Sequence, residues 1–213
     1  MAVQKKEETI ELKEIKIERF PLRIVGDSPL LVHAWSEKAI KKMLDTQTKK
    51  GAVGKAEKNP FDDFVCSLYW VKRPPIKITG EEAFEEAVKQ GAVFGFPSIA
   101  LKSAAASAGF RAKVVKDKVS TYGAFHIDEE LMSLVGTPSM RQDMVTVANG
   151  SADIRFRGEF REWSSDVIIK YNSSVISPEI VVNLINLAGF SVGIGEWRVE
   201  KGGRHGMFHV EAA

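Results

Sequence analysis

Apolar and polar residues alternate in several short runs, the pattern of strands with one buried face. Residues 153–163 alternate most regularly, with isoleucine and phenylalanine on one predicted face and arginine on the other. Residues 21–34 are apolar on both sides of a Gly-Asp-Ser-Pro turn signal, and residues 166–171 and 207–210 complete the expected strands. The two predicted faces of strand 153–163 are Ile154, Phe156 and Phe160 against Arg155, Arg157 and Arg161.

Two helices are predicted between these strands. Residues 99–108 are rich in alanine, with Ser98 as the expected N-cap and Gly109 as the residue that ends the helix. A later helix begins at the cap Ser177-Pro178 and is expected to end at Gly189. Further helices are expected over residues 36–50 and 81–90.

Without the intervening segments, the expected order is strand, helix, strand, strand, helix, strand. This order is typical of ferredoxin-like and RRM-like α+β folds, in which an antiparallel sheet carries two helices on one face. Residues 112–150 are polar, contain scattered glycines and lack a period, so they are predicted to be an inserted segment rather than a layer of the core. The length of 213 residues fits a single domain, 1–213.

The composition excludes several classes of protein. Thirty basic and 28 acidic residues give a net charge of +2, so a nucleic-acid interface must depend on where the basic residues gather. The single cysteine, Cys66, excludes a disulfide framework and a cysteine-built metal site, and its apolar surroundings predict an inert core thiol. With no recognisable signal peptide or membrane span, a cytoplasmic location and no membrane partner are expected.

The strongest candidate for chemistry is the glycine-rich segment 193–206, which contains five glycines. Glycine lets backbone N–H groups approach a phosphate closely, and interspersed basic residues add charge. Trp197 could stack on a nucleobase, and His205 could contact a phosphate, although a surface histidine is the preferred interpretation. The spacing matches neither a dinucleotide-binding fingerprint nor a P-loop, and a flexible loop before the last strand remains the alternative.

A second candidate is the start of the helix at 98. A helix N-terminus attracts anions, and Lys102 stands one turn inside the helix. Taken alone, an ordinary buried helix with a solvated lysine is the preferred interpretation.

Together these segments resemble the RAMP superfamily, in particular the backbone subunits of CRISPR RNA-guided complexes. Gly26-Asp-Ser-Pro-Leu30 looks like the opening segment of that family, and Phe96-Pro-Ser-Ile-Ala-Leu-Lys-Ser-Ala104 resembles its helix start. Residues 192–206 resemble its C-terminal glycine-rich loop, and the order of the three segments also matches. The helix start departs from the family pattern, because Ile99-Ala100 stands where small polar residues are usual and Ser103-Ala104 stands where Gly-Ala is usual.

The resemblance implies a fold that binds single-stranded guide RNA, with subunits stacked in a helical filament and a hairpin thumb over the RNA. Residues 112–150 match the thumb in placement, and residues 36–93 match a variable lobe. In the thumb, Tyr122, Phe125 and Met140 could wedge between bases. The implied nucleic-acid-binding residues are Ser98, Lys102, Arg111, Lys113, Arg141, Arg155, Arg157, Trp197, Arg198, Lys201, Gly202, Gly203, Arg204 and His205.

The resulting hypothesis is a sequence-tolerant subunit that binds single-stranded nucleic acid, guide RNA above all, and assembles along the strand with its own copies and with other effector subunits. Alternatives are a phage protein that coats single-stranded DNA in replication or recombination, and an interaction protein that mimics and caps a backbone subunit. RNA and DNA are not distinguished by the sequence.

An enzyme is the less favoured class, and no cofactor or metal site is expected. The four histidines lack metal-ligand spacing, and no nucleophile with a paired base is visible. Asp62-Asp63 is the best carboxylate pair and would serve a metal-dependent ribonuclease, although a polar segment start after Pro60 is preferred.

Overall fold

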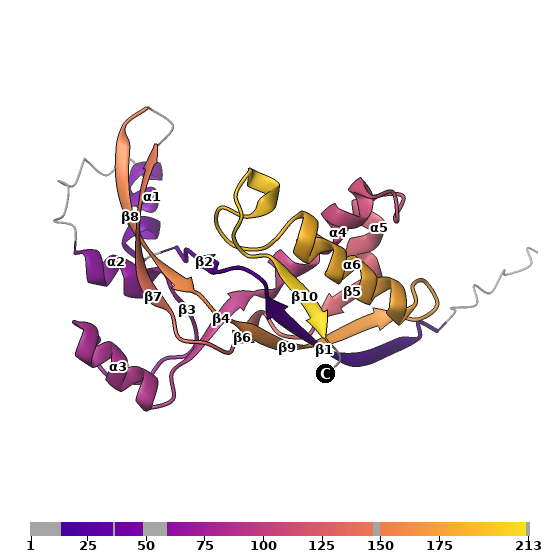
Figure 1. Ribbon diagram of the computed structural model, residues 1–213, viewed down its shortest axis with the longest axis horizontal. Helices are drawn as coiled ribbons and strands as arrows, with labels where there is room; N and C mark the ends of the chain where they lie inside the picture. Colours follow the sequence, from indigo (N-terminus) through magenta and orange to yellow (C-terminus); the bar gives the residue numbers. More distant parts are fainter. Residues whose placement is uncertain (1–13, 36, 49–58, 147–149, 212–213) are drawn as a thin grey trace, which may run out of the picture.

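The computed structural model describes residues 14–35, 37–48, 59–146 and 150–211. Its centre is a four-stranded antiparallel sheet with the strand order β10-β1-β9-β5. Two long helices, α4 and α6, lie on one face of this sheet (Figure 1). The bounds are β1 Ile17–Gly26, α4 Ser98–Arg111, β5 Phe125–Ile127, β9 Ser164–Asn172, α6 Pro178–Ser191 and β10 Phe208–Glu211.

In chain order these elements are strand, helix, strand, strand, helix, strand, and their spatial order places the fourth strand beside the first and the second at the far edge. That is the ferredoxin-like arrangement, so the expected α+β fold class is confirmed. The core lies between sheet and helices. It includes Leu22 and Ile24 of β1, Val167 and Ile169 of β9, and Leu184 of α6, all of them buried.

The predicted identity of the second strand is wrong. Residues 152–160 form β8 (Ala152–Phe160), which pairs with β7 (Ser139–Thr146) and β2 (Leu30–Val32) in a separate sheet. The second strand of the central sheet is β5, only three residues long. Its Phe125 is fully buried, and burial of this one side chain fixes a strand too short to show any period.

Residues 112–150 are therefore not an insertion outside the core. They contain α5 (Lys118–Ala124), β5, β6 (Leu131–Leu134) and β7. Met132 and Leu134 of β6 are buried with Phe125, so the expectation that this segment adds no core layer is wrong. Its last strand, β7, pairs antiparallel with β8, and the two strands project together from the body of the molecule (Figure 1). We call this element the β7–β8 hairpin.

A third sheet, β3-β4-β6, completes the half of the molecule that holds the described residues between 37 and 93. Phe64, Phe84 and Phe94 pack against one another there, with ring centroids 5.2 and 5.9 Å apart. The remaining elements are α1 Glu37–Gln47, α2 Pro60–Ser67, β3 Tyr69–Lys72, α3 Glu81–Lys89, β4 Val93–Pro97 and the 3-10 turn η1 Val199–Lys201. Residue 36 and residues 49–50, the two ends of the helix expected over residues 36–50, lie outside the described residues.

Both predicted glycine stops lie inside helices. α4 continues to Arg111, and a side-chain carbon at Gly109 would approach Leu184 Cδ2 of α6 to 2.4 Å. α6 continues to Ser191, and the same carbon at Gly189 would meet the Phe208 carbonyl oxygen of β10. These glycines therefore permit close packing between elements rather than ending the helices. No helix in the described part of the chain is both long and apolar enough to cross a membrane.

Candidate nucleic-acid interface

The glycine-rich loop 193–206 is held in place by the first half of the chain. Glu196 donates its backbone N–H to the Leu31 carbonyl at 2.9 Å, and Gly206 donates to the Pro29 carbonyl at the same distance. Four of its glycines adopt positive φ, a region that side chains disfavour. The loop is therefore hydrogen-bonded to the body of the protein, unlike the free loop of the alternative interpretation. The turn at residues 26–29 lies directly beside it.

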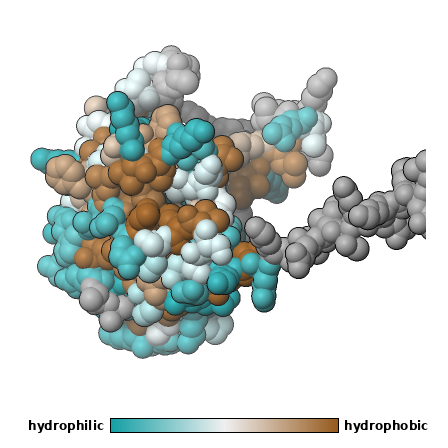
Figure 2. Space-filling model, turned by 90° about the vertical axis from the view of Figure 1, so that its right-hand side faces the viewer, coloured by the Kyte–Doolittle hydropathy of each residue, from teal (hydrophilic) through white to brown (hydrophobic). Residues whose placement is uncertain are grey.

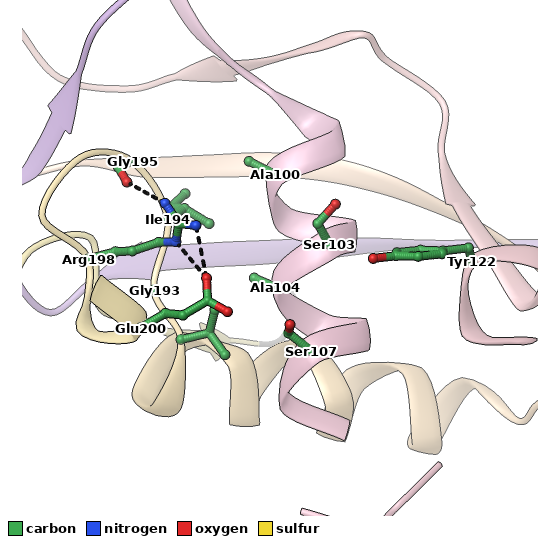
Figure 3. A pocket seen from close by; sticks show the side chains of 11 residues that line it. Ala100, Ser103, Ala104, Ser107, Tyr122, Gly193, Ile194, Gly195, Arg198 and Glu200 are labelled. Atoms are coloured by element: carbon green, nitrogen blue, oxygen red, sulfur yellow. Dashed lines mark hydrogen bonds and ion pairs between the residues drawn. The ribbon is translucent and has the colours of Figure 1, made fainter. Parts of the chain in front are cut away.

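A groove of about 190 Å³ runs between this loop and α4 (Figure 3). Ala100 and Ala104 present no more than a methyl group to it, and Ser103 and Ser107 add hydroxyl groups. These four residues share one face of α4 because they are spaced by three and four positions. The other lining residues are Tyr122, Val192, Gly193, Ile194, Gly195, Arg198 and Glu200.

Two of the predicted phosphate ligands at this groove already have a carboxylate partner. Glu200 accepts from Arg198 at 2.9 Å through Oε2 and from Arg111 at 2.7 Å through Oε1. Burial opposes ionisation of the Glu200 carboxyl, but the bonds and charges of the two arginines outweigh it and lower its pKa. Glu200 therefore neutralises much of the positive charge that the sequence pattern assigns to the loop.

Lys201 and Arg204 are different. Both are exposed, and neither has an ion-pair partner among the described residues. Gly202 between them takes φ 77°, and Gly203 brings its α-carbon so close to the Trp197 carbonyl that a side chain would not fit. The loop thus presents two free cations from a backbone that its glycines shape.

Beside them lies a largely buried cluster of charged side chains on one face of the β7–β8 hairpin. Arg141 pairs with Asp143 at 2.9 Å and with Glu159 at 2.7 Å. Arg157 is only 1% exposed, although the alternation of the strand predicts it on a solvent face, and its carboxylate partners Asp143 and Glu196 are 3.5 and 3.9 Å away. Burial lowers the pKa of the Arg157 guanidinium.

The reason for this error is that β8 is covered on both faces over its second half. α2 packs on it, and Ser67 Oγ accepts the Gly158 N–H at 2.9 Å. Toward the hairpin tip the strand is open instead, so that Ile154, expected in the core, is exposed. Arg155 pairs there with Asp153 at 3.6 Å.

His205 is buried rather than at the surface. Its Nδ1 atom has no hydrogen-bond partner in the described structure, and burial lowers its pKa. The ring lies 6.2 Å from that of Trp197, measured between centroids. Because it is buried, His205 is poorly placed for a direct contact with a phosphate.

Ser98 and Lys102 do not join the groove. Ser98 is buried as the first residue of α4 and makes no capping bond through its side chain, so the predicted cap is wrong. Lys102 Nζ lies 3.1 Å from His126 Nδ1 on β5, and burial lowers the pKa of both groups. Lys113 is exposed just beyond α4 with φ 58°.

Of the three predicted wedge residues, the structure leaves two accessible. Tyr122 lines the groove and Met140 is exposed on β7, whereas Phe125 is fully buried in the central sheet. A base-splaying role for Phe125 is excluded by that burial.

The structure also shows where the carboxylate pair and the single cysteine lie. Asp62 and Asp63 lie in the first turn of α2, whose N-cap Asn59 accepts two backbone N–H groups through its side chain. No cluster of three or more metal-ligating side chains occurs within the described ranges. Cys66 is exposed on α2, so the expectation of a core thiol is wrong.

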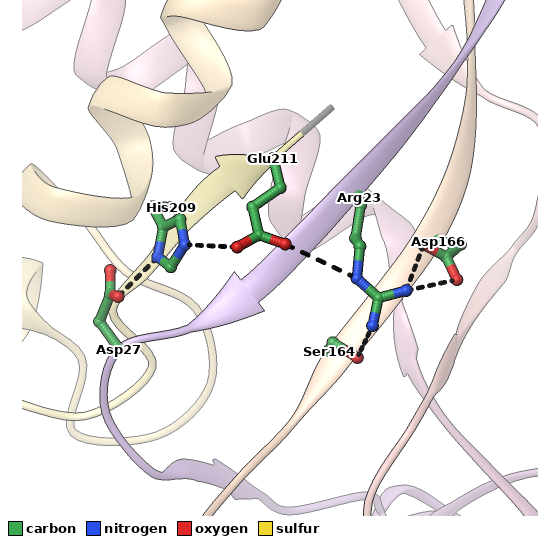
Figure 4. A network of polar contacts seen from close by, with 6 residues as sticks. All are labelled: Arg23, Asp27, Ser164, Asp166, His209 and Glu211. Carbon is green, nitrogen blue, oxygen red and sulfur yellow. Dashed lines mark hydrogen bonds and ion pairs between the residues drawn. The ribbon is translucent and has the colours of Figure 1, made fainter. Parts of the chain in front are cut away.

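Sequence reasoning missed a polar network on the open face of the central sheet (Figure 4). His209 Nδ1 of β10 lies 2.6 Å from Asp27, and Glu211 links the same strand to Arg23, which also bonds Asp166. The hydrogen bond with Asp27, helped by Glu211, raises the pKa of His209. The signal available in the sequence was the alternation of charged residues in the first and last strands.

Comparison with known proteins adds a likeness of overall shape. No family model matches the chain, and no curated protein matches it in sequence. Among solved structures, the crystal structure of Cmr6 from Pyrococcus furiosus matches with a TM-score of 0.44 and 10% identity, over 93% of this chain and all of that one. Because these values are low, the fold assignment depends on the strand order described above, and the function depends on the site.

Proposed function

We propose that this protein binds single-stranded nucleic acid, guide RNA in the first place, without base specificity, and repeats along the strand as a backbone subunit. The observation that carries the proposal is the pair Lys201 and Arg204, two exposed cations free of carboxylate partners in the described structure, on a loop that the chain holds in one conformation. The resemblance of the loop, the helix start and the opening turn to the RAMP superfamily supports the same assignment.

Phosphate contact suits this geometry for a physical reason. Lysine and arginine neutralise phosphates whatever the base sequence, and the counterions released make the affinity depend steeply on salt. The groove beside the loop has a floor of small residues, Ala100 and Ala104, which lets a polymer backbone lie close to α4.

The test is a titration of labelled single strands with the full chain at several salt concentrations. Lys201→Ala combined with Arg204→Ala is expected to weaken binding and to reduce the log–log salt slope by about 1.4, at roughly 0.7 per lost contact. The matched control, Lys77→Ala with Lys89→Ala, removes the same charge from exposed positions elsewhere and leaves the slope unchanged. An unaltered slope in the loop variant, or preference for duplex, contradicts the proposal.

RNA and DNA strands of one sequence, compared in that titration, separate the two nucleic-acid hypotheses. Preference for RNA favours a guide-RNA subunit. Preference for DNA favours a phage protein that coats single-stranded DNA.

A second candidate function is supported by the ion pairs. Arg111, Arg198 and Arg141 are each bonded to a carboxylate within 3 Å, as expected for a protein that keeps the shape of a backbone subunit without using its charge. This is the interaction protein that caps a complex. Absence of strand binding at low salt, together with a stoichiometric complex with an effector subunit, favours it over the first proposal.

A further inference from the structure

Trp197 adopts a backbone conformation that its residue type disfavours. Its φ is 50°, in the left-handed region, where a bulky side chain without local hydrogen bonding is rare. Its carbonyl oxygen accepts the His205 N–H at 3.2 Å and is so close to Gly203 that only glycine fits there. The loop thus maintains this conformation with its own hydrogen bond and its own glycine.

The indole ring that results has two cations on it. The guanidinium carbons of Arg141 and Arg157 each lie 5.8 Å from the ring centroid. These residues are paired in register across β7 and β8, so their side chains leave the same face of the hairpin, and both reach the indole ring. Trp197 nevertheless keeps 39% of its surface exposed.

The guanidinium groups of Arg141 and Arg157 are held in place by their surroundings. Arg141 is bonded to Asp143 and Glu159, and Arg157 is nine-tenths buried or more, with an Nε that has no acceptor in the described residues. An arginine so buried and so incompletely bonded is costly unless it does something else. Besides its long contacts with Asp143 and Glu196, Arg157 makes the contact with the indole ring.

We propose that Trp197 is a stacking platform for one unstacked base of the bound strand, with Arg141 and Arg157 as positioning residues that hold the indole ring in place. This inference rests on the proposed function and adds a base contact to its phosphate contacts. Stacking is tolerant of sequence because every base has a π-face. Lys201 and Arg204 in the same loop would contact phosphates near that base.

The experiment uses the full chain carrying Trp35→Phe, which removes another exposed indole. Binding is measured to an intact single strand and to the same strand with abasic sugars. Trp197→Ala is expected to weaken binding of the intact strand about tenfold and to leave the abasic strand unaffected, while Trp197→Phe retains most of the affinity. Quenching of indole emission by the intact strand is expected in the parent and lost in Trp197→Phe.

Two further variants separate stacking from structural roles. Trp197→Gly removes the positive-φ strain that Trp197→Ala retains, so it should be more stable than Trp197→Ala and lose as much affinity. Arg141→Gln should weaken the intact strand alone, because a positioning residue acts only through the ring. Equal weakening of both strands by Arg141→Gln identifies a phosphate contact and overturns the positioning role.

The outcomes distinguish this inference from the proposal beneath it. If the parent binds both strands and Trp197→Ala changes neither affinity, the stacking site is wrong and phosphate binding stands. If the parent binds neither strand, the proposed function fails and the stacking site with it.

Discussion

Glu200 reduces the number of basic side chains in the glycine-rich loop that are free to bind a phosphate. Its two carboxylate oxygens each accept from one arginine, and the bond with Arg111 of α4 ties the loop to that helix, although the Arg111 side chain stays half exposed. Charge-assisted bonds of this kind are among the stronger ones at partly buried sites. The free cations of the same motif are Lys201 and Arg204, neither of which forms an ion pair within the described residues.

At the same scale, His209 ties the last strand to the turn at 26–29. Its pKa is raised in the fold by the hydrogen bond with Asp27, so the protonated form is the stabilised one. The contribution to stability is therefore complete below the unfolded pKa of about 6.5 and is lost as the pH rises through the higher folded value. Both groups are more than one-third exposed, which limits the effect to about 1 kcal/mol or less.

This predicts a pH-dependent effect of Asp27→Asn. The variant should unfold at a lower temperature than the parent at pH 5.5, and the gap should shrink by pH 9. Thermal unfolding by circular dichroism at both pH values measures it, and His209→Gln serves as the control because it removes the titrating group. A gap that is constant with pH in Asp27→Asn contradicts the assignment of the pair.

Among the elements, β5 has the largest role for its length. It is the second strand of the central sheet in chain order and lies at the edge of that sheet. Its Phe125 is buried and pairs in register with Tyr171 of β9. A thumb that lay outside the core would leave Phe125 exposed. The β7–β8 hairpin is the element that does project, with Met140 and Met144 exposed on it.

Phe125→Ala is therefore expected to destabilise the protein by about 3–5 kcal/mol, the usual cost of deleting a buried aromatic ring. Met140→Ala on the exposed hairpin is the matched control and should change stability by no more than about 0.5 kcal/mol. Urea unfolding of both variants checks this. Near-equal stabilities would mean that β5 is not a layer of the core.

On the scale of the whole molecule, apolar side chains remain exposed at both ends. Phe110, Val119 and Phe190 are exposed on the helices α4 to α6, and the helical end of the molecule in Figure 2 has apolar patches among polar ones. At the other end, Ile40 and Leu44 of α1 are exposed four positions apart, on one helix face. Surfaces of this kind are common at contacts between proteins.

Assembly along a strand is the prediction at this scale. Because bound copies on one strand are brought to high local concentration, exposed apolar surfaces should add contacts between neighbours. Light scattering with single strands of increasing length is expected to show mass that rises with strand length. One protein per strand at every length would contradict assembly and favour the capping function.

The α+β class and the strand–helix–strand–strand–helix–strand order of the central sheet could be predicted from the sequence, because strand alternation and the helix cap at Ser177 are local patterns. The identity of the second strand could not. Residues 152–160 alternate better than the three residues of β5, and only burial of Phe125 and pairing of β8 with β7 decide which strand joins the central sheet.

The candidate site divides in the same way. The grouping of Trp197, Lys201 and Arg204 at the loop follows from the sequence, since neighbours in the chain remain neighbours in space. Which charges are free depends on tertiary packing, because Arg111 and Glu200 lie 89 positions apart and Arg157 and Glu196 come from different elements. Electrostatic partners across such separations are set by packing, which leaves no periodic trace in the chain.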